Sequence, residues 1–187
     1  MYNVGMKRLL AIGLLLSVAS AAFAQTPASA DALIASATRT GMKTGKTVFV
    51  RFTASWCGWC HKMQSVLDRP DVKPIWDKYF VSQPIVVLEN GEKEALENAG
   101  GEELMKKQGG EGQGIPYFYF MDPKTGKTLA NSLMPAAEGK KPANVGCPYQ
   151  PEEIAFFMKL LEKAAPKMTA AERTTIEEGF KALSKKG

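Results

Sequence analysis

Apolar and polar residues alternate along the chain in segments that predict strands and helices in turn. A run rich in β-branched and aromatic residues at 47–53 predicts a strand, and a second apolar run at 84–88 predicts another. The continuous apolar character of the second run is typical of a strand that is covered on both faces. Residues 115–121 and 127–133 predict a hairpin, because the turn-forming residues 122–126 join them.

Residues spaced at helical intervals fill much of the remaining chain. In the segment from 151 to 165, Pro151 opens the pattern and the apolar residues form a stripe that would face a core. In the last segment, Thr169 and Glu172 have the spacing of a capping box, which predicts where that helix begins. The expected helices cover residues 28–40, 57–67, 72–80, 151–165 and 169–184, and Gly41 ends the first of them.

Residues 91–112 are polar, with two short helical patches at 92–98 and 102–107. They separate the strand expected at 84–88 from the one expected at 115–121. We therefore expect an unusually long connection between these two strands.

The N-terminal residues have the composition of an export signal. The basic pair Lys7-Arg8 precedes an apolar run at 9–18 that is too short to span a bilayer. Ala22-Phe23-Ala24 then supplies the small residues of a cleavage site, which favours cleavage over a retained membrane anchor. We expect a signal peptide at 1–24 and export to the periplasm.

The remaining residues, 25–187, are enough for one domain with one core. We expect the core of this domain at about 46–165 and a C-terminal helical extension at 166–187. The formal net charge of the whole chain is +5, and it falls to +3 without the two basic residues of the signal peptide. So small a charge favours neither nucleic acid nor stable membrane insertion.

Three cysteines carry the clearest chemical signal. Cys57 and Cys60 are separated by two residues, at the junction between an expected strand and an expected helix. The free N–H groups and the positive end of the helix dipole stabilise a thiolate at that place. Cys57 is therefore the predicted nucleophile, and Cys60 is the resolving thiol one helical turn further on. Cys147 is expected to be a small buried hydrophobic residue.

Three other interpretations of the cysteine pair compete with a redox function. A zinc site needs two more ligands, and only His61 and Cys147 are available, so we expect no metal. A structural disulfide is the second interpretation. The third is covalent attachment of a c-type haem, because Cys57 to His61 matches its pattern and His61 could be an axial ligand. Our prediction is that the protein has no cofactor beyond a redox-active Cys57–Cys60 disulfide.

These residues resemble the thioredoxin superfamily of thiol–disulfide oxidoreductases. The shared pattern is a strand, then Trp56-Cys57-Gly58-Trp59-Cys60 and a helix, and later Ile115-Pro116 leading into another strand. The resemblance covers roughly residues 46–135. It implies an α/β, thioredoxin-like fold, with a central mixed β-sheet flanked by helices. This chain would add an enlarged connection between the strand expected at 84–88, which would be the third strand of the family's fold, and the cis-proline strand at 115–121. It would also add an extra C-terminal helix.

The resemblance also implies residues that contact a substrate. Pro116 would be cis and would present the backbone of Ile115 beside Cys57 as an edge for an extended substrate, whereas a trans proline at a strand start is the alternative. Trp56 and Trp59, with Gly58 between them, would form an apolar rim around the sulfur. For Trp56, packing in the core is an equally good alternative.

Three ionisable residues are candidates for tuning the thiol pKa values. Six residues before the first cysteine, where the family's reductants carry an aspartate, this chain has Arg51. Arg51 could point toward the pair and favour thiolates, or it could extend to solvent and leave Glu89 to supply the acid. His61 could favour a thiolate if it is protonated, but a position on the helix surface is the favoured interpretation.

The sequence thus predicts a periplasmic thiol–disulfide oxidoreductase that exchanges disulfides with protein substrates. The apolar Ile115 and the uncharged residues between the cysteines favour a reductant that receives its electrons from a membrane thiol carrier. An oxidase or isomerase of the same fold, a binding module without catalysis and, more remotely, a c-type haem protein are the alternatives.

Overall fold

The structure is a computed structural model that describes residues 26–136, 138–139 and 141–184. The predicted signal peptide at residues 1–24 lies outside these residues. Among the helices of the described part, none is both long and apolar enough to cross a membrane.

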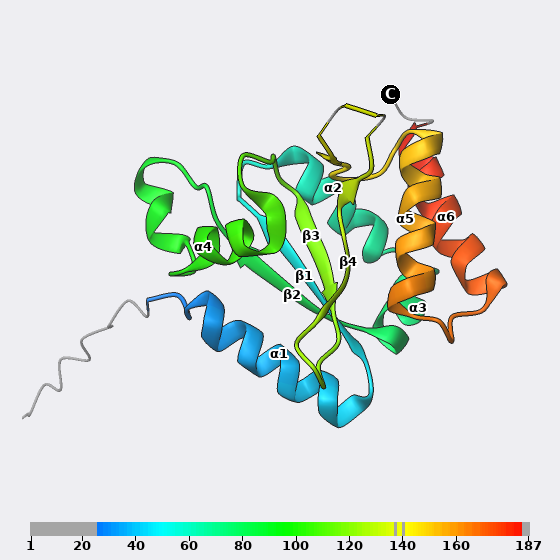
Figure 1. Cartoon of the computed structure of the whole chain (residues 1–187), viewed down its shortest axis with the longest axis horizontal. Helices are drawn as coiled ribbons and strands as arrows, with labels where there is room; N and C mark the ends of the chain where they lie inside the picture. Colours follow the sequence, from blue (N-terminus) through cyan, green and yellow to red (C-terminus); the bar gives the residue numbers. More distant parts are fainter. Residues whose placement is uncertain (1–25, 137, 140, 185–187) are drawn as a thin grey trace, which may run out of the picture.

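Four strands form one mixed sheet in the order β2–β1–β3–β4 (Figure 1). β1 pairs in parallel with β2 and antiparallel with β3, and β3 pairs antiparallel with β4. Two shorter strands, β5 and β6, form a separate ribbon. The strands are β1 (Thr47–Thr53), β2 (Phe80–Val86), β3 (Tyr117–Met121), β4 (Thr128–Asn131), β5 (Leu133–Met134) and β6 (Ala143–Asn144).

Helices cover both faces of the sheet, as the resemblance to the thioredoxin superfamily leads us to expect. Figure 1 shows α1 and α4 on one side of the strands and α5 and α6 on the other. The helices are α1 (Ala30–Thr44), α2 (Gly58–Leu67), α3 (Lys73–Tyr79), α4 (Gly101–Met105), α5 (Pro151–Ala164) and α6 (Ala170–Ser184).

The alternation of side chains along β1 assigns its residues to these two layers. Val48 and Val50 pack with residues of α1, whereas Phe49 packs with residues of α2, α3, α5 and α6. Because successive side chains of a strand point to opposite faces, Arg51 lies on the same face as Phe49. The sequence of β1 thus directs one charged residue toward the layer that contains α2, the helix that follows Cys57.

The largest differences from the predicted bounds are those of β2 and α1. β2 covers Phe80–Val86, not 84–88, because Leu88 has a left-handed backbone (φ 56°) that ends the extended run. Nor is β2 covered on both faces: Ser82 and Pro84 are exposed, as an edge strand allows. α1 continues through Gly41 to Thr44 and ends at Gly45, whose φ of 70° suits glycine.

The long connection between β2 and β3 is present and contains three short helical pieces. These are the 3₁₀ helix η1 (Gly91–Leu96), α4, and the π-helical turn η2 (Lys106–Gly110). Met105 of α4 is buried in the α1 layer of the core, so the connection packs on the sheet. The enlarged connection that the sequence predicts is thus confirmed.

The extra C-terminal helix, α6, is also confirmed, and it is part of the core. Ile176 and Phe180 are buried with residues of α2, α3 and α5. On the other face of the sheet, Ala30 and Ala37 of α1 are buried too. The core therefore extends beyond residues 46–165 at both ends.

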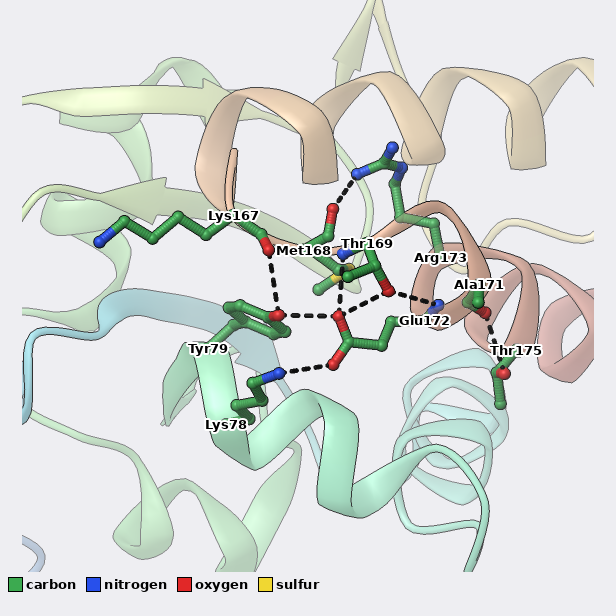
Figure 2. A network of polar contacts seen from close by, with 9 residues as sticks. All are labelled: Lys78, Tyr79, Lys167, Met168, Thr169, Ala171, Glu172, Arg173 and Thr175. Atoms are coloured by element: carbon green, nitrogen blue, oxygen red, sulfur yellow. Dashed lines mark hydrogen bonds and ion pairs between the residues drawn. The ribbon is translucent and has the colours of Figure 1, made fainter.

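A polar network anchors the start of α6 to α3 (Figure 2). The carboxylate of Glu172 accepts hydrogen bonds from Lys78 Nζ at 2.8 Å and from the Tyr79 hydroxyl at 2.7 Å. It also accepts the backbone N–H of Thr169, while the Thr169 hydroxyl accepts the N–H of Glu172. This reciprocal pair is the capping box that the sequence predicts.

Candidate active site

Cys57 and Cys60 form a disulfide at the N-terminus of α2. Cys57 is the N-cap residue, and its Sγ accepts the backbone N–H of Cys60 at 3.1 Å. A tight turn delivers Cys57 to this position, because its N–H donates to the carbonyl oxygen of Ala54 at 3.1 Å. After reduction, the same N–H and the helix dipole would stabilise a thiolate on Cys57.

The segment that leads into β3 passes beside the disulfide. The Ile115–Pro116 peptide bond is cis. The carbonyl oxygen of Ile115 lies 3.6 Å from Cys57 Sγ. The backbone before β3 and the first cysteine therefore form neighbouring parts of one surface.

Two tryptophans and a glycine surround the disulfide. Trp56 is 53% exposed, and its indole N–H donates to the Leu88 carbonyl oxygen at 2.6 Å, so the core-packing alternative is wrong. Trp59 is 41% exposed and stacks on Tyr149 with 4.8 Å between ring centroids. Gly58 has open space where a side chain would stand. These residues form an apolar surface beside Cys57, and the backbone at Gly58 is open to an approaching chain.

A groove of about 360 Å³ is lined by Trp59, which stands between the two cysteines, and by Ile115, whose carbonyl oxygen lies beside Cys57 Sγ. Asn144 of β6 fixes one of its sides, because its side-chain amide donates to the carbonyl oxygens of Gly114 at 2.6 Å and Pro116 at 3.0 Å. The ring of Tyr149, stacked on that of Trp59, forms another side of the groove. The lining includes Trp59, Ile115, Pro116, Asn144, Cys147 and Tyr149.

Arg51 is buried on the α2 side of β1, with 7% of its surface exposed. Its Nη1 donates to the Cys60 carbonyl oxygen at 3.1 Å, and its Nη2 donates to Gln64 Oε1 at 2.6 Å. Burial lowers the pKa of Arg51, and the nearby carboxylate of Asp68 opposes this shift. The alternative in which Arg51 extends to solvent is therefore wrong.

Glu89 and His61 both contact Ser55, two residues before Cys57. The Glu89 carboxylate accepts the backbone N–H of Ser55 at 2.6 Å and its hydroxyl at 2.8 Å. The ring of the exposed His61 places Nε2 at 2.8 Å from the Ser55 carbonyl oxygen. Glu89 therefore binds the turn before the disulfide, and α2 continues without a break through His61.

Cys147 lies in the core beside the groove and is 4% exposed. Burial raises the pKa of its thiol to about 12, although the positive charges of Lys62 and Arg51 act in the opposite direction. A buried thiol with so high a pKa is a poor nucleophile at neutral pH. Among the described residues, no cluster of His, Cys, Asp and Glu side chains has the arrangement of a metal site.

Sequence reasoning missed four residues of the site. Ser55 and Gln64 are uncharged polar residues near the cysteines. Their importance shows only in the contact of Ser55 with Glu89 and of Gln64 with Arg51. Asn144 and Tyr149 belong to the region 134–149, where no periodic pattern signals a contact with the site. The aromatic ring of Tyr149 was the one available signal.

Comparisons with known proteins agree with this geometry. A family model described as a thioredoxin-like domain matches residues 34–141, which is more than half of the chain. A search of curated proteins finds no significant match.

Solved structures with a similar course of the chain include a disulphide isomerase from Xylella fastidiosa Temecula1. It is 19% identical with a TM-score of 0.46, over 84% of this chain and 92% of that one. A DsbH oxidoreductase is 20% identical with a TM-score of 0.44, over 83% of this chain and 95% of that one. A thioredoxin from Thermus thermophilus is 21% identical with a TM-score of 0.45, over 79% of this chain and 93% of that one.

Proposed function

The chain belongs to the thioredoxin-like domain family, and with its Cys57–Cys60 disulfide it is a thiol–disulfide oxidoreductase; from this premise we propose that it works in the periplasm and reduces disulfides of other proteins. The observation that carries the proposal is the position of Cys57 as the N-cap of α2, with its Sγ on the N–H of Cys60. This N–H and the helix dipole favour the thiolate that disulfide exchange requires.

In the reduced protein, the Cys57 thiolate attacks one sulfur of a substrate disulfide. The other substrate sulfur leaves as a thiolate, and a mixed disulfide forms. Cys60 then attacks Cys57 Sγ, and its proton passes to solvent or to a departing thiolate. The second substrate thiol is released, the Cys57–Cys60 disulfide closes, and two electrons have passed to the substrate.

The surface around Cys57 supports a polypeptide as the substrate. The exposed rings of Trp56 and Trp59 offer apolar contact area, and the open space at Gly58 lets a chain come close. The backbone of Ile115, next to Cys57 Sγ, can pair with an extended segment as a strand edge does. Extended segments of flexible or unfolded proteins fit such a surface best.

Features of the N-terminal sequence support the proposed location, and the location in turn motivates the proposed electron supply. Lys7-Arg8, the apolar run after it and Ala22-Phe23-Ala24 support export. The periplasm is kept oxidising, so a reductant there needs electrons from elsewhere. We propose a membrane thiol carrier as their source. We also propose that the disulfide is the only redox group, so the purified protein should lack the Soret absorption of a c-type haem.

One observation favours an alternative direction. The buried cation of Arg51 lies against the backbone of Cys60 and favours thiolates, and this stabilises the reduced protein and raises its reduction potential. An oxidase, or an isomerase, is therefore the second candidate.

Equilibration of the Cys57–Cys60 pair with a glutathione buffer distinguishes the two directions. We expect a potential closer to the thioredoxin value of about −270 mV than to the value of about −120 mV of the strong oxidant DsbA. A potential nearer to −120 mV contradicts the reductant and supports the oxidase.

A further inference from the structure

Every backbone and side-chain polar group of Ser55 has a partner outside its own turn. Its N–H and its hydroxyl both donate to the Glu89 carboxylate, at 2.6 Å and 2.8 Å. Its hydroxyl oxygen accepts from Lys93 Nζ at 3.1 Å, and His61 Nε2 lies 2.8 Å from its carbonyl oxygen. These contacts with three different residues fix Ser55 in one orientation.

Ser55 belongs to the turn that places the first cysteine. The hydrogen bond from the N–H of Cys57 to the Ala54 carbonyl oxygen closes this turn, and Ser55 and Trp56 are its two central residues. Trp56 is held as well, through its indole N–H on the Leu88 carbonyl oxygen. Both central residues of the turn are thus attached to residues 88–93.

The backbone of residues 88 and 89 is itself arranged for these contacts. Among the described residues, Leu88 is the one non-glycine residue with a positive φ, and its carbonyl oxygen is the acceptor for Trp56. The N–H of the next residue, Glu89, donates to Glu97 Oε1 at 2.7 Å. A residue held in a sparsely populated backbone conformation points to a functional constraint.

Glu89 is 6% exposed, and both oxygens of its carboxylate accept hydrogen bonds from Ser55. A buried negative charge near a thiolate would disfavour that thiolate, so activation of Cys57 does not explain why Glu89 is buried beside Ser55. A role in fixing the geometry of the turn does explain it, because attack on a disulfide requires the attacking sulfur to be held in one orientation.

We infer that Glu89 is a positioning residue for thiol–disulfide exchange, which acts through Ser55 to hold the turn that presents Cys57. This inference rests on the proposed function. It also gives a role to the enlarged connection between β2 and β3, whose first residues form the fixed side of the turn.

The test uses the reduced full-length protein and measures the rate constant for its reaction with a disulfide-containing peptide as a function of pH. Glu89→Ala removes both carboxylate oxygens, so the N–H and the hydroxyl of Ser55 lose this partner. Ser55→Ala removes one of the two hydrogen bonds, and Ser55→Thr keeps it. Glu92→Ala, an exposed change in the same segment, is the matched control.

We expect Glu89→Ala to lower the limiting rate constant at high pH by about tenfold or more, since small displacements of a reacting group have effects of this size. The Cys57 pKa should stay the same or fall. Ser55→Ala should show a smaller decrease in the same direction, and Ser55→Thr and Glu92→Ala should match the wild type.

A limiting rate constant for Glu89→Ala within threefold of the wild type overturns the inference, and any larger decrease supports it. If Glu89→Ala does not fold, the comparison of Ser55→Ala with Ser55→Thr decides, and equal rate constants for these two overturn the inference. A wild-type protein that does not reduce the peptide at all contradicts the proposed function instead.

Discussion

Arg51 and Cys60 meet between the sheet and the redox helix. The guanidinium group of Arg51 donates to the Cys60 carbonyl oxygen at 3.1 Å, so that a buried positive charge lies under the N-terminal turn of α2. A positive charge in this position favours a thiolate at the cysteine pair.

Replacing Arg51 by Asp should therefore raise the Cys57 pKa and lower the reduction potential. Each pKa unit corresponds to about 1.4 kcal/mol, or roughly 30 mV for this two-electron couple. The pH dependence of iodoacetamide alkylation measures the pKa, and the buried Cys147 should contribute little to it. Gln64→Ala removes the other partner of Arg51 without a change in charge and should leave both values unchanged. Identical alkylation profiles for wild type and Arg51→Asp would show that Arg51 does not tune the thiols.

The stack of Trp59 on Tyr149 should contribute to the binding of peptide substrates. Aromatic pairs of this kind are worth about 0.5–1.5 kcal/mol, so Tyr149→Ala should raise KM about two- to tenfold as Trp59 loses its support. kcat should change little, because the contact of Tyr149 in the site is with the ring of Trp59 and not with a reacting sulfur. Tyr149→Phe keeps the ring and should behave like the wild type. An equal KM for Tyr149→Ala and the wild type would mean that this wall of the groove does not bind substrate.

The contacts of Glu172 should make the stability of the protein depend on acid pH. Hydrogen bonds, with that from Lys78 the largest cause, lower the pKa of Glu172 to about 2. A carboxylate with a lowered pKa stabilises the fold above its unfolded-state pKa of about 4.3, and this contribution is lost as the pH falls toward 2. Glu172→Gln should therefore be less stable at pH 7, with a difference that shrinks between pH 4 and pH 2. Urea unfolding at several pH values measures it, and a difference that does not change with pH would contradict the assignment.

Phe180 should show that α6 is part of the core. Its ring is fully buried, 5.0 Å from the ring of Phe157 in an edge-to-face contact. Phe180→Ala should lower the free energy of unfolding by about 3–5 kcal/mol. Leu129→Ala, at a position 39% exposed, should change it by less than about 0.5 kcal/mol. A similar small effect at both positions in urea unfolding would indicate that α6 is not needed for the fold.

Local signals in the sequence predict the elements around the cysteines well. The β-branched and aromatic residues of β1 and the cysteine pair after them predict a strand and a helix that the structure has at Thr47–Thr53 and Gly58–Leu67. The second strand is predicted too late, because the apolar residues at 84–88 are a stronger signal than the mixed residues at 80–83. An edge strand tolerates polar residues, and a sequence pattern does not show which strand is at the edge.

Contacts within the site that depend on tertiary structure could not be predicted in the same way. Alternation places Arg51 and Phe49 on one face of β1, but only the packing of α2 on that face brings Arg51 to Cys60. Glu89 is 34 positions from Ser55 in sequence, and the parallel pairing of β1 with β2 brings the ends of these strands together. Tyr149 reaches Trp59 from a loop without periodicity, so its role becomes visible only in the folded chain.

The central claim is that Cys57 carries out thiol–disulfide exchange with protein substrates. Reduction of insulin disulfides in the presence of dithiothreitol tests it most directly, with the wild type and Cys57→Ser compared at equal concentration. The account predicts rapid insulin reduction by the wild type and only the uncatalysed rate with Cys57→Ser, because the attacking sulfur is missing. Equal rates for the two proteins would contradict it and would favour a thioredoxin-like binding module that does not catalyse the exchange.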